Sequence, residues 1–337
     1  MLNVAIKIDE LENNKTLSNE ILTALYEQKL LKVFVPDILG GLGKNLIDGL
    51  KIFRQMGQLD GNIGWAVTIG SGGNMFLPLF QHDVGKIYFE PENAVISGSG
   101  KPNGTAHKVE GGYIVSGSWR YCSGADYGTT FTMNTINEEN GEIVTCSVKR
   151  GDVTIIQDWQ AIGLKATASH TIQLENVFVK DTEIFQFDQI QNNYNLPVHT
   201  FPFLTFSESS FFSLVIGMAH NVLTKQQKAL NEKFNEEHSR YQIVSEKIQQ
   251  AQTIVDQIEV AFDAEIETLW QQHTQLQIDE QLVSEFSQFC QTASSELLSE
   301  LQLLMRYFGM EAVLETSELS YSWRNFCTAS QHAFLTP

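Results

Sequence analysis

The residues best suited to chemistry lie in one stretch, residues 109–130, which reads VEGGYIVSGSWRYCSGADYGTT. A glycine pair indicates a turn, a β-type run follows it, and Trp119 and Tyr121 then lead to Ser123. A strand with alternating aromatic residues can lay a flat apolar wall against a ring, and its hydroxyl and backbone donors can reach polar atoms at the ring's edge. The alternative is an ordinary β-hairpin edge whose aromatic residues pack into a core. This stretch alone leaves both interpretations open.

Charge and hydropathy exclude several classes of partner. The chain of 337 residues has 22 Lys and Arg against 40 Asp and Glu, which gives a net charge of −18. Such a charge repels phosphate backbones and anionic lipid heads, so we expect neither nucleic acid nor a membrane as a partner. No uninterrupted apolar run approaches the roughly 20 residues of a membrane span. The first residues show no basic-then-apolar signal layout.

The cysteines and histidines do not indicate a metal site. The four cysteines, Cys122, Cys146, Cys290 and Cys327, are scattered and form no CxxC pair. This pattern is typical of reduced thiols and predicts a cytoplasmic protein without a disulfide framework. The histidine spacings suggest no metal cluster, so we expect no bound metal.

The elements that must position these residues change type twice along the chain. Helical spacing of apolar residues predicts a helical domain over residues 1–90. A period of two predicts a compact β domain over residues 91–190. Helical patterns return over residues 191–337 and predict an antiparallel four-helix bundle. The predicted bundle helices cover residues 211–230, 239–273, 282–308 and 314–334. The fold class is therefore α+β, with helices on both sides of a β domain in sequence.

This order, together with four motifs, resembles the acyl-CoA dehydrogenase superfamily over essentially the whole chain. The motifs lie in residues 27–43, 101–117, 158–179 and 306–332. The four motifs occur in the same order as in the family. The resemblance implies a flavin, FMN or FAD, between the β domain and the bundle. It also implies a homo-oligomer, a dimer or a tetramer.

The resemblance places cofactor-binding residues at definite positions. Tyr121, Cys122 and Ser123 fall where the family lines the isoalloxazine ring, and Ser99 falls at the flavin contact of the preceding strand. Gly104 and Thr105 fall where the family's Gly-Ser pair reaches the phosphate-bearing tail. Arg306 and Gly309 match a region that reaches this tail from a neighbouring subunit, although Arg306 could equally be a surface cation.

The C-terminus favours one branch of this superfamily. Dehydrogenases of the acyl-CoA type need a carboxylate that abstracts a proton. Here no acidic residue follows Glu318, and His332 occupies the equivalent place. This resembles the flavin-dependent two-component monooxygenases, which oxygenate small, often aromatic substrates with reduced flavin from a separate reductase. The resemblance makes His332 the catalytic residue, as a base or a hydrogen-bond partner. The alternative is a histidine that merely packs or caps at the chain end.

Three further points remain open. Residues 229–241 lack the Arg-x-x-Phe-Gly with which FAD-binding members usually hold adenine, which favours FMN or a flavin bound only when reduced. Asn74 stands near the place of a histidine found in several hydroxylases and could replace it as a donor. The rival functions are an acyl-CoA dehydrogenase with Glu208 or Glu311 as base, and a degenerate flavin-binding scaffold.

Overall fold

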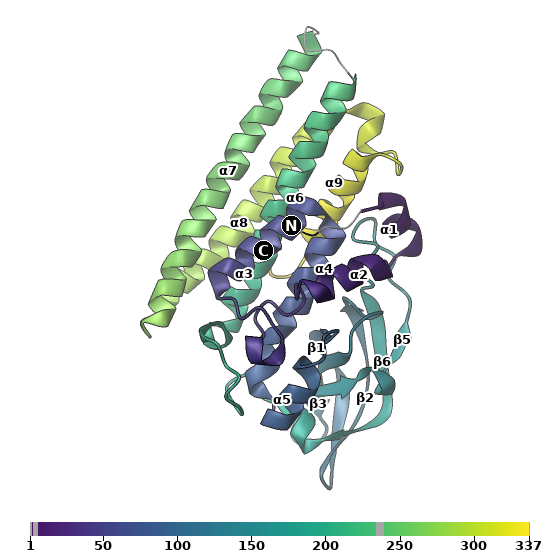
Figure 1. Ribbon diagram of the computed structural model, residues 1–337, viewed down its shortest axis with the longest axis vertical. Helices are drawn as coiled ribbons and strands as arrows, with labels where there is room; N and C mark the ends of the chain where they lie inside the picture. Colours follow the sequence, from purple (N-terminus) through teal and green to yellow (C-terminus); the bar gives the residue numbers. More distant parts are fainter. Residues whose placement is uncertain (1, 3–5, 234–238, 337) are drawn as a thin grey trace.

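Helices at both ends of the chain flank a block of strands in the middle of the sequence (Figure 1). In this computed structural model, which describes residues 2, 6–233 and 239–336, the element type changes between Phe89 and Ile96 and again between Phe185 and Phe203. The predicted α+β class and the order of elements are confirmed. The domain boundaries at residues 90 and 190 stay predictions.

Among the N-terminal helices, those that begin after Ser18, Asn45 and Asp60 have a side-chain cap. Ser18 Oγ accepts the N–H of Ile21 at 3.3 Å, and the Asp60 carboxylate accepts the N–H groups of Asn62 and Ile63. Such side chains satisfy the donors that the first turn of a helix leaves unpaired. The N-terminal helices are α1 (Ile8–Asn14), α2 (Asn19–Glu27), α3 (Leu46–Leu59), α4 (Gly61–Gly72) and α5 (His82–Phe89), with the 3-10 segments η1 (Asp37–Leu39) and η2 (Gly73–Leu79).

Gly70 near the end of α4 and Gly73 at the start of η2 let other elements approach closely. A Cβ at Gly70 would lie 2.9 Å from the Leu31 side chain, and one at Gly73 would lie 2.5 Å from Ile96. The helix therefore packs on the preceding loop on one side and on the first strand on the other.

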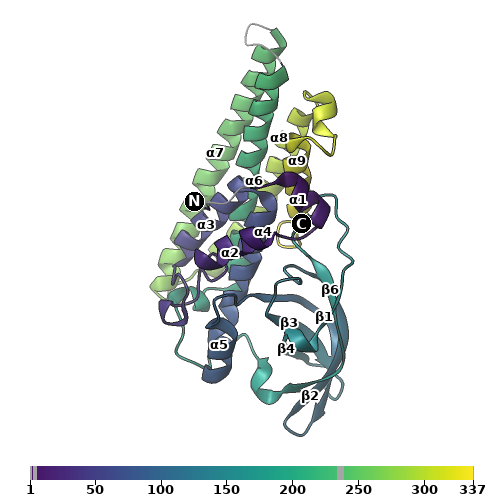
Figure 2. The ribbon, with the colours of Figure 1, turned by 45° about the vertical axis from the view of Figure 1, so that its right-hand side comes forward.

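A seven-stranded mixed sheet forms the middle block, in the order β5-β6-β2-β1-β3-β4-β7. Only β1 and β3 run parallel among the described pairs, and the sheet curves below the helices (Figure 2). The strands are β1 (Ile96–Val109), β2 (Gly112–Cys122), β3 (Thr130–Asn137), β4 (Ile143–Lys149), β5 (Thr154–Ile156), β6 (His170–Lys180) and β7 (Ile184–Phe185). Of the hairpin-edge interpretation of residues 109–130, the hairpin with β1 and the core packing of Trp119 are confirmed, but the edge position is wrong because β2 lies between β1 and β6.

The aromatic residues of β2 do not form one wall. Trp119 is fully buried in the core of the sheet, whereas Tyr121 is 55% exposed. Two positions apart on a regular strand they would share a face. The pairing with β6 is interrupted between Trp119 and Cys122, and Tyr121 has a left-handed φ of 66°. This irregularity turns the two rings to different sides.

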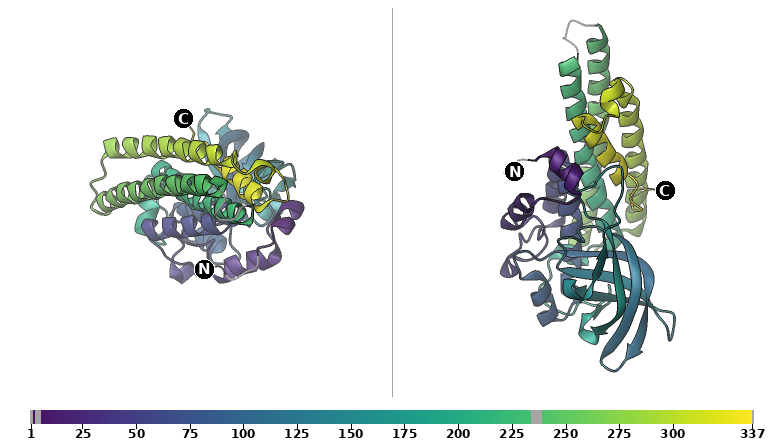
Figure 3. Two further views of the ribbon diagram at one scale, coloured as in Figure 1. Left: turned by 90° about the horizontal axis from the view of Figure 1, so that it is seen from above. Right: turned by 90° about the vertical axis from the view of Figure 1, so that its right-hand side faces the viewer.

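The C-terminal part is a bundle whose longest helices extend away from the sheet (Figure 3). Its helices are α6 (Phe203–Lys233), α7 (Ser239–Thr274), α8 (Glu280–Met305) and α9 (Glu318–Ala329), with η5 (Pro197–Thr200) and η6 (Gly309–Ala312). The prediction of a helix over residues 314–334 is wrong at both ends. His332 lies in a turn beyond α9, where its N–H bonds back to the Ala329 carbonyl.

Asparagine side chains join helices of both helical parts to the loop before β6. Asn62 of α4 and Asn325 of α9 accept the backbone N–H groups of Ala166 and Leu164, at 2.9 and 2.6 Å. Both acceptors are buried, so their hydrogen bonds are shielded from water. The loop of residues 164–169 is thereby fixed against the helices, next to the end of β2.

Candidate active site

A cavity of about 240 Å³ lies where α4 and η2, strands β1 and β3, α6 and the C-terminal turn meet. Much of its wall is aromatic, contributed by Phe76, Phe185, Phe187, Phe203, Phe206, Phe211 and Phe334. Phe187 and Phe203 are partly exposed, so the cavity opens toward solvent beside them. A concave, mostly apolar site with a few polar groups is the usual form of a small-molecule site.

His332 lines this cavity between aromatic rings. Its imidazole stacks on Phe211, with ring centroids 3.8 Å apart, and meets Trp65 edge-on at 5.7 Å. Burial lowers the pKa of His332 to about 4, because the apolar surroundings disfavour the charged form. The imidazole is therefore neutral near pH 7.

One hydrogen bond indicates which nitrogen of His332 carries the proton. The backbone N–H of Phe334 donates to Nδ1 at 3.4 Å, so Nδ1 is the acceptor. A neutral imidazole then has its proton on Nε2. With this tautomer the ring offers an N–H donor, and the low pKa makes it a weak base. Of the two roles expected for His332, hydrogen-bond partner fits better.

Two hydroxyl groups in the cavity wall are buried and lack a protein partner. Thr68 of α4 and Ser210 of α6 are each 2% exposed, and neither oxygen has a hydrogen-bond partner in the described structure. By contrast, Ser207 in the same wall donates to the Phe203 carbonyl at 2.8 Å. Buried hydroxyls normally find a partner, so these two oxygens indicate a ligand.

Ser123 is connected to the cavity through Trp65. The Trp65 indole N–H donates to Ser123 Oγ at 2.9 Å, and Ser123, Ser169 and Thr167 form a chain of hydroxyls 2.8 and 2.7 Å apart. Thr167 donates to the Leu164 carbonyl, which directs the protons of the other two hydroxyls toward Thr167. For Ser123 to donate to a ligand, the chain of donors must reverse.

The structure brings some of the predicted cofactor residues together and separates others. Ser99 lines the same cavity as His332, and Ser97 beside it donates to the Ser123 carbonyl at 2.7 Å. The Cys122 thiol points into the β core, where burial raises its pKa to about 12. Any contact of Cys122 with a ring would therefore come from its backbone.

Tyr121 does not line the cavity. Its exposed ring meets Trp159 edge-on at 6.1 Å, and the Arg120 guanidinium lies 4.9 Å from its centroid. A non-glycine residue with positive φ costs conformational energy. The contact of Tyr121 with a flavin stays a prediction for this outer face.

Gly104 and Thr105 lie further along β1, on opposite faces. A Cβ at Gly104 would lie 2.3 Å from the buried Trp119 ring, so packing inside the sheet requires this glycine. Thr105 is exposed and pairs in register with Ser116 of β2. Their predicted contact with the flavin tail stays untested.

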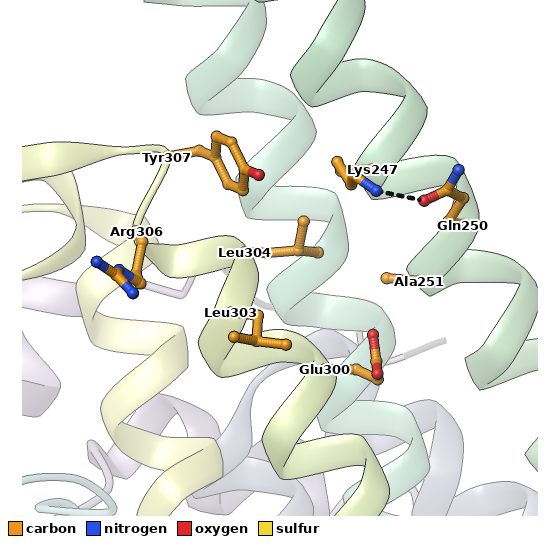
Figure 4. Close-up of a pocket in the computed structure, with 8 residues that line it drawn as sticks. All are labelled: Lys247, Gln250, Ala251, Glu300, Leu303, Leu304, Arg306 and Tyr307. Carbon is orange, nitrogen blue, oxygen red and sulfur yellow. Dashed lines mark hydrogen bonds between the residues drawn. The ribbon is translucent and has the colours of Figure 1, made fainter.

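Arg306 and Gly309 lie away from this cavity, after α8. Arg306 borders a separate hollow of about 470 Å³ between α7 and α8, where Lys247 donates to Gln250 at 3.0 Å (Figure 4). Gly309 has a left-handed φ of 60° at the turn. Their predicted role concerned a neighbouring subunit, and it stays a prediction.

Asn74 cannot act as the substitute donor, so that suggestion is wrong. Its side chain accepts from the Phe34 N–H and donates to the Leu31 and Gly70 carbonyls. These bonds fix the loop before α3 and use both donors of the amide.

The carboxylates suggested for a dehydrogenase do not reach the cavity. Glu208 is buried on another face of α6, where Ser287 of α8 donates to it and burial raises its pKa. Glu311 is exposed in η6. No carboxylate is among the described residues that line the cavity. This arrangement offers no base for proton abstraction next to a carbonyl.

Sequence reasoning missed Thr68, Ser210 and the aromatic wall. A signal was present in α6, whose first turns alternate serines with phenylalanines (FLTFSESSFFS). The described residues contain no group of three or more candidate metal ligands. None of the described helices combines the length and apolar character that crossing a bilayer requires.

Comparisons with known proteins show what this chain is similar to. Residues 210–337 match the family model "Acyl-CoA dehydrogenase, C-terminal domain". Over 98% of this chain and 89% of the other, the structure superposes on a crystal structure of 3-HSA hydroxylase from Rhodococcus sp. RHA1, with a TM-score of 0.90 and 20% identity. The chain thus has the acyl-CoA dehydrogenase fold, and the resemblance to that superfamily is confirmed.

The names of two further similar proteins mention a flavin. The chain is 25% identical over 225 residues to "Flavin-dependent monooxygenase, oxygenase subunit HsaA" of Rhodococcus jostii (strain RHA1), an alignment that covers 64% of this chain and 59% of that protein. It spans less than two thirds of that relative's length. A structure of XiaF from Streptomyces sp. in complex with FADH2 and glycerol matches with a TM-score of 0.87 and 18% identity, over 97% of this chain and 87% of that one.

Proposed function

We propose that this chain is the oxygenase component of a two-component flavin-dependent monooxygenase. It would use reduced FMN or FAD, supplied by a separate reductase, to oxygenate a small aromatic-like substrate. The observation that carries this proposal is the neutral His332, which lines an aromatic cavity where no carboxylate is present among the described residues. The similarity to an oxygenase subunit and to a protein with bound FADH2 supports it.

The residues of the cavity fit a flavin ring on the side of the sheet. A Cβ at Gly100 or Gly72 would meet no atom within 4 Å, so the space beside both is open. Ser99 and the backbone of β1 offer polar groups along this wall. A bound reduced flavin would supply the activation of oxygen.

The protein's own residues would then orient the substrate and exclude water. The phenylalanines of α6 and the C-terminal turn enclose the helical side of the cavity, where Phe211 holds the His332 ring by stacking. His332 Nε2–H would donate a hydrogen bond to an oxygen in the cavity. In a water-poor site such a fixed donor is worth more than in solution.

Two further expectations belong to this proposal. We infer a homo-oligomer, a dimer or tetramer, in which Arg306 and Gly309 serve the site of a neighbour. Four free cysteines fit the predicted cytoplasmic location. Light scattering of the purified protein tests the first expectation, and a monomer at micromolar concentration would contradict it.

Oxygenation under an isotope label tests the proposed activity. The protein is mixed with a flavin reductase, NADH, FMN or FAD, and a panel of phenols and indoles under ¹⁸O₂. One ¹⁸O atom in a product, dependent on both proteins, is the expected result. If the protein instead purified with tightly bound FAD, and an acyl-CoA bleached this FAD without oxygen, the activity would be that of a dehydrogenase.

A further inference from the structure

The cavity wall contains no permanently charged side chain. Among the described residues that line it there is no Asp, Glu, Lys or Arg, and its one titratable group is His332. A carboxylate moved from water into such surroundings loses its hydration without gaining a counter-ion. The site therefore penalises anionic molecules.

Two hydroxyl groups of the same wall have no hydrogen-bond partner and can donate to a neutral polar group. The hydroxyls of Thr68 and Ser210 are buried and lack protein partners, and both residues line the cavity, Thr68 from α4 and Ser210 from α6. Each hydroxyl can donate to one oxygen and accept from another hydroxyl. An empty site leaves both groups unsatisfied, so a molecule whose oxygen reaches these hydroxyls supplies the hydrogen bonds that they lack.

We propose that this cavity selects an uncharged aromatic molecule with a hydroxyl or carbonyl oxygen, which Thr68 and Ser210 hold, and that it rejects the same ring bearing a carboxylate. The inference rests on the proposed function only in that the molecule would be the substrate. The net charge of −18 acts in the same direction, since the field of the whole chain repels anions.

Three molecules with one ring system test the two parts of the proposal. They are 2-naphthol, naphthalene and 2-naphthoate, and their binding to the purified protein is measured by equilibrium dialysis at pH 7, without oxygen, with and without reduced flavin. We expect naphthol to bind about 10-fold more tightly than naphthalene, from the hydrogen bonds. We expect naphthoate to bind at least about 30-fold more weakly than naphthol, from the unpaired charge.

Variants connect the preference to the two hydroxyls. Thr68→Val keeps the shape of the side chain and removes its hydroxyl, and Ser210→Ala does the same for α6. Each should reduce the naphthol-to-naphthalene preference about threefold and the double variant should abolish it. Ser207→Ala is the matched control, because its hydroxyl lines the same cavity but already bonds to Phe203. It should leave the preference unchanged. Thermal unfolding of each variant verifies the fold.

The outcomes separate this inference from the proposed function. Naphthoate binding as tightly as naphthol, an unaltered preference in the double variant, or no binding of any of the three molecules would overturn the inference. Selective binding of naphthol in a protein that takes up no reduced flavin would uphold it while the proposed function fails.

Discussion

At the residue scale, His332 shows how context decides a role. The sequence places an imidazole at the position of a carboxylate, and an ordinary histidine with a pKa near 6.5 would suit a base. The structure surrounds it with Phe211 and Trp65, and burial moves its pKa to about 4. A sequence pattern cannot report this shift, because residues from α4 and α6 cause it. The sequence pointed to His332, which lines the cavity, but it could not predict the protonation state of the ring.

Substitution of His332 should separate a donor from a base. His332→Gln keeps a side-chain N–H donor, whereas His332→Ala removes it. We expect about 100-fold less product per flavin oxidised in the alanine variant, and a smaller loss in the glutamine variant. The measurement is the ratio of product to hydrogen peroxide in reductase-coupled turnover. Equal losses in both variants would contradict the donor role.

Buried histidines should make the protein sensitive to acid. The pKa values of His332 and His199 are both lowered from 6.5 to about 4 by burial. The unfolded chain therefore takes up protons from about pH 6.5, while the folded chain does so only near pH 4. The contribution of these histidines to the free energy of unfolding should be fully present above pH 6.5 and should decrease as the pH falls toward 4.

Denaturant unfolding between pH 7.5 and 4.5 tests this dependence. His332→Gln and His199→Gln should each flatten the slope relative to the natural chain. His107→Gln changes an exposed histidine and is the control. A slope that neither buried substitution alters would contradict the assigned cause.

At the element scale, local patterns predicted the helices and strands, and long-range contacts determined the site. The change from helical spacing to a period of two and back was visible in the sequence. The irregular end of β2 was not, and it separates Trp119 from Tyr121 although their spacing predicts one face. The predicted last helix was also too long: α9 ends at Ala329, and His332 lies in a turn beyond it. Such turns depend on tertiary contacts that periodicity does not contain.

The loop of residues 164–169 should depend on the asparagines that hold it. Asn325→Ala leaves the Leu164 N–H buried without its acceptor and should cost about 2 kcal/mol of unfolding free energy. It should also weaken the binding of reduced flavin, because Thr167 and Ser169 support Ser123 from this loop.

A matched asparagine gives the control for this loop. Asn221 of α6 also bonds to the backbone, but as a donor to the Gln58 carbonyl, and its side chain is only half-buried. Asn221→Ala should cost less than about 1 kcal/mol and leave flavin binding unchanged. Chemical denaturation and flavin titration measure both quantities, and equal effects of the two substitutions would contradict the role of the loop.

At the scale of the whole molecule, one cavity uses all three parts of the chain. Its walls come from α4 and η2, from strands of the sheet, and from α6 and the C-terminal turn. The order of these parts and the family resemblance were predictable because the periodic patterns and the four motifs are contained in continuous stretches of the sequence. Thr68 and Ser210 belong to no motif, and only folding brings them to the same wall.

The most direct test of the central claim is an anaerobic titration of the purified protein with reduced and oxidised FMN and FAD, followed by tryptophan fluorescence. We predict saturable binding of a reduced flavin, more tightly than its oxidised form, with quenching that Trp65→Phe diminishes, since Trp65 joins Ser123 to His332. Failure of both reduced flavins to bind the folded protein would contradict the account.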